Sequence, residues 1–223
     1  MRANNSTRKL VLAAMFAALA LIVTVAIPHI HLVAAAPFLS YDTKDVILAI
    51  CGFTLGPIPA LMTTAVVSFL EMLTVSGTGP IGFVMNLLSS AAFVLPAAIL
   101  YRRKHTLSGA GFGLALSVAV AVVTMLMWNY FITPLYMGVP RETVAAMLLP
   151  AFLPFNLIKA ALNASITMLV YKPVSRALKQ IGLLDSRTDG SPTPKGHGLI
   201  AALIAALVLA ACVIAIVILS RAS

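Results

Sequence analysis

The chain has 223 residues and a mass of 23.4 kDa, with 61% hydrophobic residues, 9% charged residues, a mean hydropathy of +1.05 and a formal net charge of +9. Ordinary soluble domains contain roughly 45–50% apolar and about 25% charged residues, so this composition excludes a soluble globular protein. The excess of Lys and Arg does not indicate a nucleic-acid partner, because these residues occupy short gaps between long apolar runs. The pattern is that of an all-α polytopic membrane protein.

Seven apolar segments are predicted to be helices, because about 20 mainly apolar residues cross a bilayer. The Gly56-Pro57 turn separates the second segment from the third, since proline removes a helical hydrogen-bond donor. The second segment is short for a span. A further apolar piece, residues 144–149, is expected to be re-entrant or interfacial. The predicted helices cover residues 10–27, 45–55, 57–75, 83–101, 109–133, 154–179 and 199–219.

These helices suggest three parts of the chain. Residues 1–180 form a six-helix membrane domain, residues 181–198 a polar cytoplasmic linker, and residues 199–223 an additional C-terminal transmembrane helix. Most of the 15 Lys and Arg residues fall on one side of the bilayer when the N-terminus is cytoplasmic. Because cytoplasmic loops carry an excess of Lys and Arg, we expect a multi-pass protein of the cell (cytoplasmic) membrane with a cytoplasmic N-terminus.

Polar residues gather at one predicted depth, near the outer ends of several helices. An ionisable side chain at mid-bilayer costs at least about 2.5–3.5 kcal/mol, so such residues suggest a functional site. Each also has a plain structural explanation: Lys159 could pair with Glu71 or extend to the interface, and asparagines often link helices by hydrogen bonds. Spacings of three and four residues place part of the set on one helical face. The set is Glu71, Asn86, Asn129, Asn156, Lys159 and Asn163.

The chemistry of these groups points to a planar ligand. An amide offers both a donor and an acceptor, which suits a heterocycle whose edge carries both. The sequence contains no phosphate-binding loop and no hydrolase or metalloprotease motif. We therefore expect a binding protein that is not an enzyme, needs no cofactor, and takes any energy for uphill transport from partner subunits.

The first predicted helix suggests a partner surface. Alanines recur there at intervals of four residues, and small residues allow another membrane helix to approach closely. Such helices are also common without a partner. The two pairs are Ala13 with Ala17 and Ala14 with Ala18.

Several separate segments resemble the riboflavin-specific substrate-binding (S) components of energy-coupling factor (ECF) transporters. They are residues 38–45, 52–57, 78–86, 129–134 and 154–163, and the resemblance extends over about residues 8–179. It implies a six-helix membrane fold that captures riboflavin near the outer surface. The additional C-terminal helix departs from the family pattern.

The resemblance also implies roles for particular residues. Asn129, Asn156 and Lys159 would contact the isoalloxazine ring of riboflavin, which is a transported ligand. The alanine pairs would dock on a transmembrane (T) component, and two ATPases attached to that component would supply the energy. The first outer loop would close over the vitamin, through Leu39, Ser40, Tyr41, Asp42 and Thr43.

Three other functions remain open at this stage. The chain could be an S component for another vitamin, such as thiamine or a pterin. It could be a membrane-embedded enzyme that modifies lipid head groups, although the sequence has no carboxylate cluster for a metal. It could also be an assembly subunit in which the polar residues only join helices.

Overall fold

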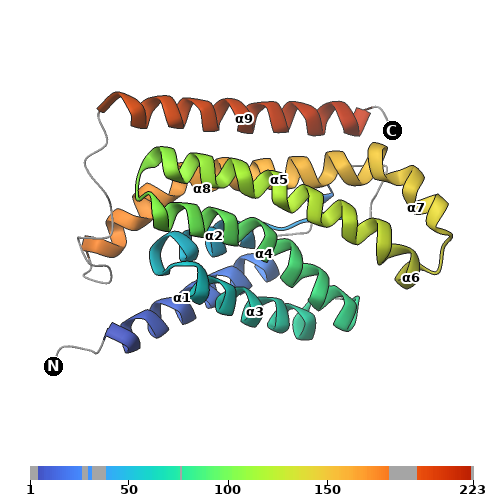
Figure 1. Ribbon diagram of the computed structural model, residues 1–223, viewed down its shortest axis with the longest axis horizontal. Coiled ribbons are helices and arrows are strands. Elements are labelled where there is room, and N and C mark those ends of the chain that lie inside the picture. Colours follow the sequence, from blue (N-terminus) through green and yellow to red (C-terminus); the bar gives the residue numbers. More distant parts are fainter. Residues whose placement is uncertain (1–4, 27–29, 32–38, 76, 181–194, 222–223) are drawn as a thin grey trace.

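The computed structural model describes residues 5–26, 30–31, 39–75, 77–180 and 195–221. These residues are almost entirely helical, and the long helices run side by side along the longest axis of the molecule (Figure 1). The elements are α1 (Asn5–Ala26), β1 (Ile30–His31), β2 (Ser40–Tyr41), α2 (Lys44–Leu55), α3 (Pro57–Thr74), α4 (Gly79–Arg103), α5 (Leu107–Phe131), α6 (Thr133–Met137), α7 (Arg141–Met147), a π-helical turn (Leu148–Phe152), α8 (Leu153–Gln180) and α9 (Lys195–Arg221).

The predicted all-α membrane architecture is confirmed. Six helical segments among the described residues are long and apolar enough to cross a membrane. The segment predicted to be too short is α2, which has 12 residues and is enclosed by α1, α3, α4 and α8. Its close packing depends on Gly52, where a Cβ atom would lie 2.8 Å from the Cβ of Ala98. The short helix is therefore the centre of the bundle.

The two ends of the bundle differ in chemistry. At one end lie the start of α1, the exposed Arg102, Arg103 and Lys104 between α4 and α5, and the start of α9; we call this the basic end (Figure 1). The opposite end carries α6, α7 and an antiparallel hairpin in which Ile30 pairs with Tyr41 and His31 with Ser40. We call it the hairpin end.

The segment before α8 corrects one prediction. Residues 144–149 were expected to form a separate re-entrant or interfacial piece, with a new helix from residue 154. Instead α7, the π-helical turn and α8 form one continuous helical run from Arg141 to Gln180. Pro150 and Pro154 lack N–H groups that an α-helix would use, and the π-helical turn accommodates them without ending the helix.

Other helix ends differ from prediction by a few residues. The fourth helix begins at Gly79 instead of residue 83, because Pro80 is tolerated in a first turn. The fifth covers Leu107–Phe131, two residues earlier than predicted at each end. The first begins at Asn5, and the predicted end at residue 27 lies outside the described residues.

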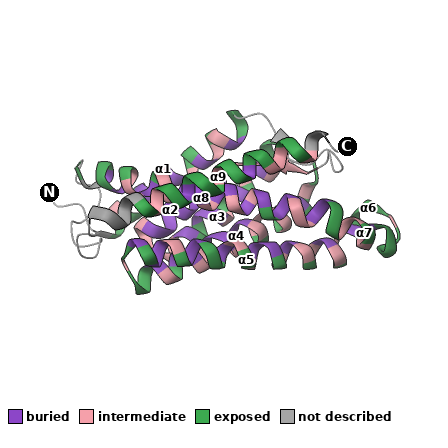
Figure 2. Ribbon diagram, turned by 90° about the horizontal axis from the view of Figure 1, so that it is seen from above, coloured by how far each residue is buried: buried purple, intermediate pink, exposed green. Residues whose placement is uncertain are grey.

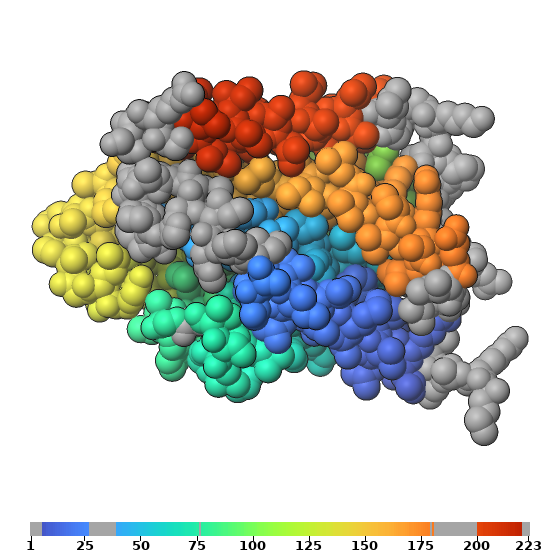
Figure 3. All heavy atoms as spheres, turned by 180° about the vertical axis from the view of Figure 1, so that it is seen from behind, coloured from blue at the N-terminus to red at the C-terminus, as the bar shows by residue number. Residues whose placement is uncertain are grey.

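The additional helix α9 lies along one edge of the bundle. The space-filling view from behind shows α9 as a separate row beside α8 (Figure 3). Most of the described residues of α9 are exposed (Figure 2). Near the hairpin end its Leu209, Cys212 and Ile216 pack with Tyr41 and Phe155. Most of the predicted linker lies outside the described residues, so the division of the chain into domains stays a prediction.

The two predicted alanine pairs of α1 differ in exposure. It buries Leu12, Phe16 and Ala20 against the bundle. Ala14 and Ala18 lie on the exposed side, whereas Ala13 and Ala17 are half-buried. The pair Ala14 and Ala18 is therefore the one that a partner helix can reach.

Candidate ligand-binding site

A cluster of ion pairs joins the hairpin to three helices. Lys159 of α8 donates to Asp42 Oδ2 at 3.0 Å. The same oxygen lies 3.7 Å from the ammonium nitrogen of Lys44, which also pairs with Glu71 of α3. Lys44 is only 1% exposed. A buried ammonium without a partner is strongly destabilising, so these carboxylates are needed to keep Lys44 at the start of α2.

A second polar chain runs beside the first. The Tyr41 hydroxyl donates to Asn163 Oδ1 at 2.8 Å, and Asn163 Nδ2 donates to Asp45 Oδ2 at 3.4 Å. Ser90 of α4 donates to the other oxygen of Asp45 at 2.5 Å. Burial raises the pKa of Tyr41 to about 12, so its hydroxyl keeps the proton that it donates. This chain of hydrogen bonds joins the hairpin, through Tyr41, to α8, α2 and α4.

The two chains border a small cavity between α2, α4, α5 and α8. Its volume is about 10 Å³, which is room for about one water molecule. Polar groups come from several helices, while Phe93 and Met125 supply apolar surface. The prediction that Asn156, Lys159 and Asn163 share one face of their helix is confirmed, since all three line this cavity. A three-ring heterocycle does not fit while the helices and the hairpin stand in this arrangement.

Other predicted residues lie around this centre. Asn129 is buried and accepts a hydrogen bond from Thr133 at 3.1 Å; it lies one helical turn beyond Met125, which lines the cavity. Asn156 donates to the carbonyl of Phe152 at 2.8 Å. Asn86 lies one turn before Ser90 on α4.

The predicted outer loop lies at the same end. Tyr41 and Asp42 belong to the polar chains described above. Leu39 packs against the apolar cluster that includes α9, Ser40 pairs within the hairpin, and Thr43 is the residue before α2.

The structure corrects one pairing and adds residues that the sequence reasoning missed. Lys159 pairs with Asp42, whereas the sequence analysis offered Glu71, which instead holds Lys44. Lys44 was expected to lie just before the second predicted helix and Asp45 to begin it, and neither was expected to be buried, yet both are. A charged pair directly followed by an apolar helix was the signal that could have identified them.

The buried pair of Lys44 and Glu71 makes a testable prediction. Glu71→Leu leaves Lys44 with only the more distant Asp42, and removing one partner of a buried pair costs about 3–5 kcal/mol. We expect a clearly lower midpoint of thermal unfolding in detergent. Lys44→Met combined with Glu71→Leu removes both charges and should recover part of the loss.

Glu142→Gln on the exposed side of α7 is the matched control and should leave the midpoint unchanged. The pairing would be contradicted if the double variant were destabilised by as much as, or more than, the sum of the separate effects of Lys44→Met and Glu71→Leu.

Comparisons with known proteins agree with this architecture. The family model for "ECF transporter, substrate-specific component" matches residues 8–171. The chain is 28% identical over 151 residues to "Riboflavin transporter RibU" of Staphylococcus aureus (strain TCH60), covering 65% of this chain and 79% of that protein. It is 24% identical over 144 residues to "Riboflavin transporter FmnP" of Bacillus subtilis (strain 168), covering 60% and 75%.

A solved structure gives the same result for the fold. The structure titled "Structure and mechanism of the S component of a bacterial ECF transporter" matches with a TM-score of 0.66 and 26% identity, covering 78% of this chain and 99% of that one. The family match ends before α9 begins. The matched range includes the hairpin, the ion pairs and the cavity, and the chain belongs to the substrate-specific components of ECF transporters.

Proposed function

We propose that this chain captures riboflavin at the hairpin end of the bundle and delivers it to an ECF importer. The observation that carries the proposal is the group of buried amides, carboxylates and ammonium groups around the cavity between α2, α4, α5 and α8. Two relatives are named as riboflavin transporters, which supports this choice of vitamin. The chain acts as a binding subunit and not as an enzyme, and riboflavin is its cargo.

Binding requires the site to open. The isoalloxazine ring has an edge that alternates acceptors and donors, and amides such as those of Asn156 and Asn129 can match it. Lys159 donates to Asp42 at 3.0 Å and has further N–H groups that could donate to a ring oxygen, but the cavity of about 10 Å³ has no room for the ring. The hairpin must therefore move away, and it can close again once the ligand provides new partners. The wrong molecule would leave these amides and charges unpaired, which gives selectivity.

Partner subunits would supply the energy. The basic end has the excess of Lys and Arg that is expected on the cytoplasmic side, which supports a cytoplasmic N-terminus and a hairpin on the outer side. A T component with two attached ATPases would bind along α1, where Ala14 and Ala18 lie on the exposed side.

A riboflavin titration tests the proposal directly. The purified chain should quench flavin fluorescence in a saturable way, while thiamine and a pterin should neither bind nor compete. Saturable binding of thiamine or the pterin without binding of riboflavin would assign a different vitamin. Folded protein that binds none of the three would reject the function.

The amides make a prediction about affinity. Asn156→Ala and Asn129→Ala each remove a group proposed to bond the ring, and each should weaken riboflavin binding by about 1–3 kcal/mol. The dissociation constant from the fluorescence titration measures this, with Glu142→Gln as an exposed control at the same end. Unchanged affinity in both asparagine variants would show that these amides serve only to join helices.

The pair of Lys159 and Asp42 makes a prediction about rates. Asp42→Asn weakens the contact that must break, so riboflavin should associate several-fold faster, as seen by stopped-flow fluorescence. Lys159→Met should instead weaken binding, because it removes a ligand contact as well as the closing contact. Slower association in Asp42→Asn would contradict a closing role for this pair.

The exposed alanine pair makes a prediction about assembly. Ala14→Leu combined with Ala18→Leu should prevent co-purification with the T component, because larger side chains keep a partner helix at a distance. Riboflavin affinity should not change. Leu19→Ala, also exposed on α1, is the control. Normal co-purification of the alanine variant would place the T component elsewhere.

A further inference from the structure

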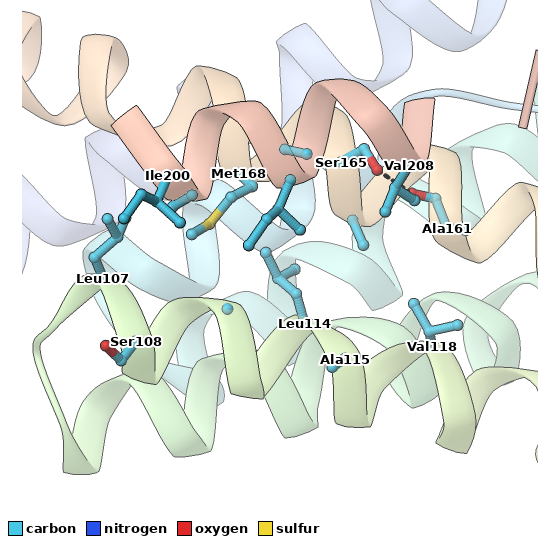
Figure 4. A pocket seen from close by; sticks show the side chains of 15 residues that line it. Leu107, Ser108, Leu114, Ala115, Val118, Ala161, Ser165, Met168, Ile200 and Val208 are labelled. Atoms are coloured by element: carbon cyan, nitrogen blue, oxygen red, sulfur yellow. Dashed lines mark hydrogen bonds between the residues drawn. The ribbon is translucent and has the colours of Figure 1, made fainter. Parts of the chain in front are cut away.

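A large apolar crevice lies between α5, α8 and α9 (Figure 4), and it shares no lining residue with the cavity of the candidate ligand site. Its volume is about 610 Å³. Leu114 and Met168 point into it, and Ile200 and Val208 line it from α9. The polar side chains of its lining are only the hydroxyls of two serines, one of which, Ser165, donates to the carbonyl of Ala161 at 2.8 Å. Water would find few partners there, so the crevice suits hydrocarbon.

The crevice exists because α9 packs closely over only part of its length. Near the hairpin end, Cys212 and Leu209 of α9 contact Phe155 and Ile158 of α8. Toward the basic end, small residues such as Gly111, Ala164 and Ala201 face one another and leave space. An unfilled apolar gap loses dispersion contacts, and the surrounding bilayer provides chains that can fill it.

The length of the crevice matches one leaflet. On α5 it runs from Leu107 to Val118, which is about 16 Å at 1.5 Å per residue. The hydrocarbon core of a bilayer is about 30 Å thick, so the crevice extends over about half of it. Figure 4 shows Leu107 and Ile200 at one end of the crevice and Val118 and Val208 at the other.

The mouth of the crevice lies beside a group of cations. Arg102 and Arg103 end α4 and Lys104 lies three residues before Leu107, which lines the crevice; all three cations are exposed at the basic end. The connection is short and fixed, since Thr106 donates its N–H to the carbonyl of Lys104 at 2.7 Å and caps α5. Clusters of Lys and Arg at this depth attract anionic head groups.

We propose that the crevice holds an acyl chain of an anionic phospholipid, whose phosphate group is bound by Arg102, Arg103 and Lys104. The lipid would fill the space between α9 and the six-helix bundle on the basic side. This inference does not depend on which vitamin the chain carries, because none of these residues lines the cavity at the hairpin end.

Native mass spectrometry of the full chain in a non-ionic detergent tests the proposal, with phosphatidylglycerol and phosphatidylcholine of the same acyl chains as probes. The wild type should retain one phosphatidylglycerol with at least a tenfold preference. Arg102→Gln, Arg103→Gln and Lys104→Gln together should abolish the preference. Lys9→Gln, an exposed cation at the basic end of α1, should keep it.

Two separate variants fill the crevice from different helices. A Cβ on Gly111 would meet only Met168 Cε, at 3.6 Å, so Gly111→Leu can place its side chain in the space. Ala201→Leu does the same from α9. Either should reduce retained lipid at least tenfold, whereas Ala119→Leu and Ala206→Leu, on exposed positions of α5 and α9, should not.

The fold of each variant is checked by circular dichroism, and a variant that does not fold is replaced by the other. Equal retention of the two lipids by the wild type, or undiminished retention in a folded crevice-filling variant, would overturn the proposal. Co-purification of a neutral apolar molecule in place of the phospholipid would overturn it as well.

Discussion

The arrangement of this protein depends on the neutralisation of charges within a bilayer. Two ammonium groups, of Lys44 and Lys159, share one carboxylate oxygen of Asp42, and Asp42 lies directly after the hairpin. Because unpaired charge is costly in an apolar medium, this sharing holds the segment after the hairpin beside α2 and α8. The hairpin is held by these ion pairs and hydrogen bonds together with the packing of Leu39 and Tyr41 against α8 and α9, whereas the bundle is held mainly by close contact of small and apolar residues.

This difference between the hairpin and the bundle suits a subunit that must hold its cargo and then release it. The helices α2, α4, α5 and α8 carry the groups around the cavity, and α2 packs closely on α4 and α3 where Gly52 meets Ala98 and Ala60. In the proposed opening only the hairpin would move. This would break the ion pair of Asp42 with Lys159 and the hydrogen bond of Tyr41 with Asn163 without separating the helices that carry the amides.

Helix α9 lies beyond the family match and contacts two regions of the bundle. Near the hairpin end it touches Tyr41 and Phe155, and near the basic end it borders the apolar crevice. A helix is stiff over this length, so its contacts at one end and its spacing at the other are not independent. The hairpin contacts α9 near one end and the crevice borders it near the other, so a change at either end would affect the position of the whole helix.

The sequence predicted the parts of the fold that follow from length and period. Long apolar runs gave the helices, and the spacing of Asn156, Lys159 and Asn163 gave their shared face on α8. The partner of Lys159 could not be found in this way, because Asp42 lies far away in the chain and only the folded bundle brings the two together. The burial of Lys44 and Asp45 was missed for the same reason, since their position next to a loop is typical of exposed residues.

The π-helical turn between α7 and α8 has a consequence for how this family of sequences can vary. Such a turn contains more residues than an α-helical turn of the same rise, and each residue added to or removed from an α-helix rotates everything beyond it by about 100°. Length changes at Leu148–Phe152 would therefore turn α7, with the Arg141 that lies over the rings of Tyr130 and Phe131, without disturbing α8. An insertion or deletion there would change the direction of α7 and leave Asn156, Lys159 and Asn163 in the same positions relative to one another on α8.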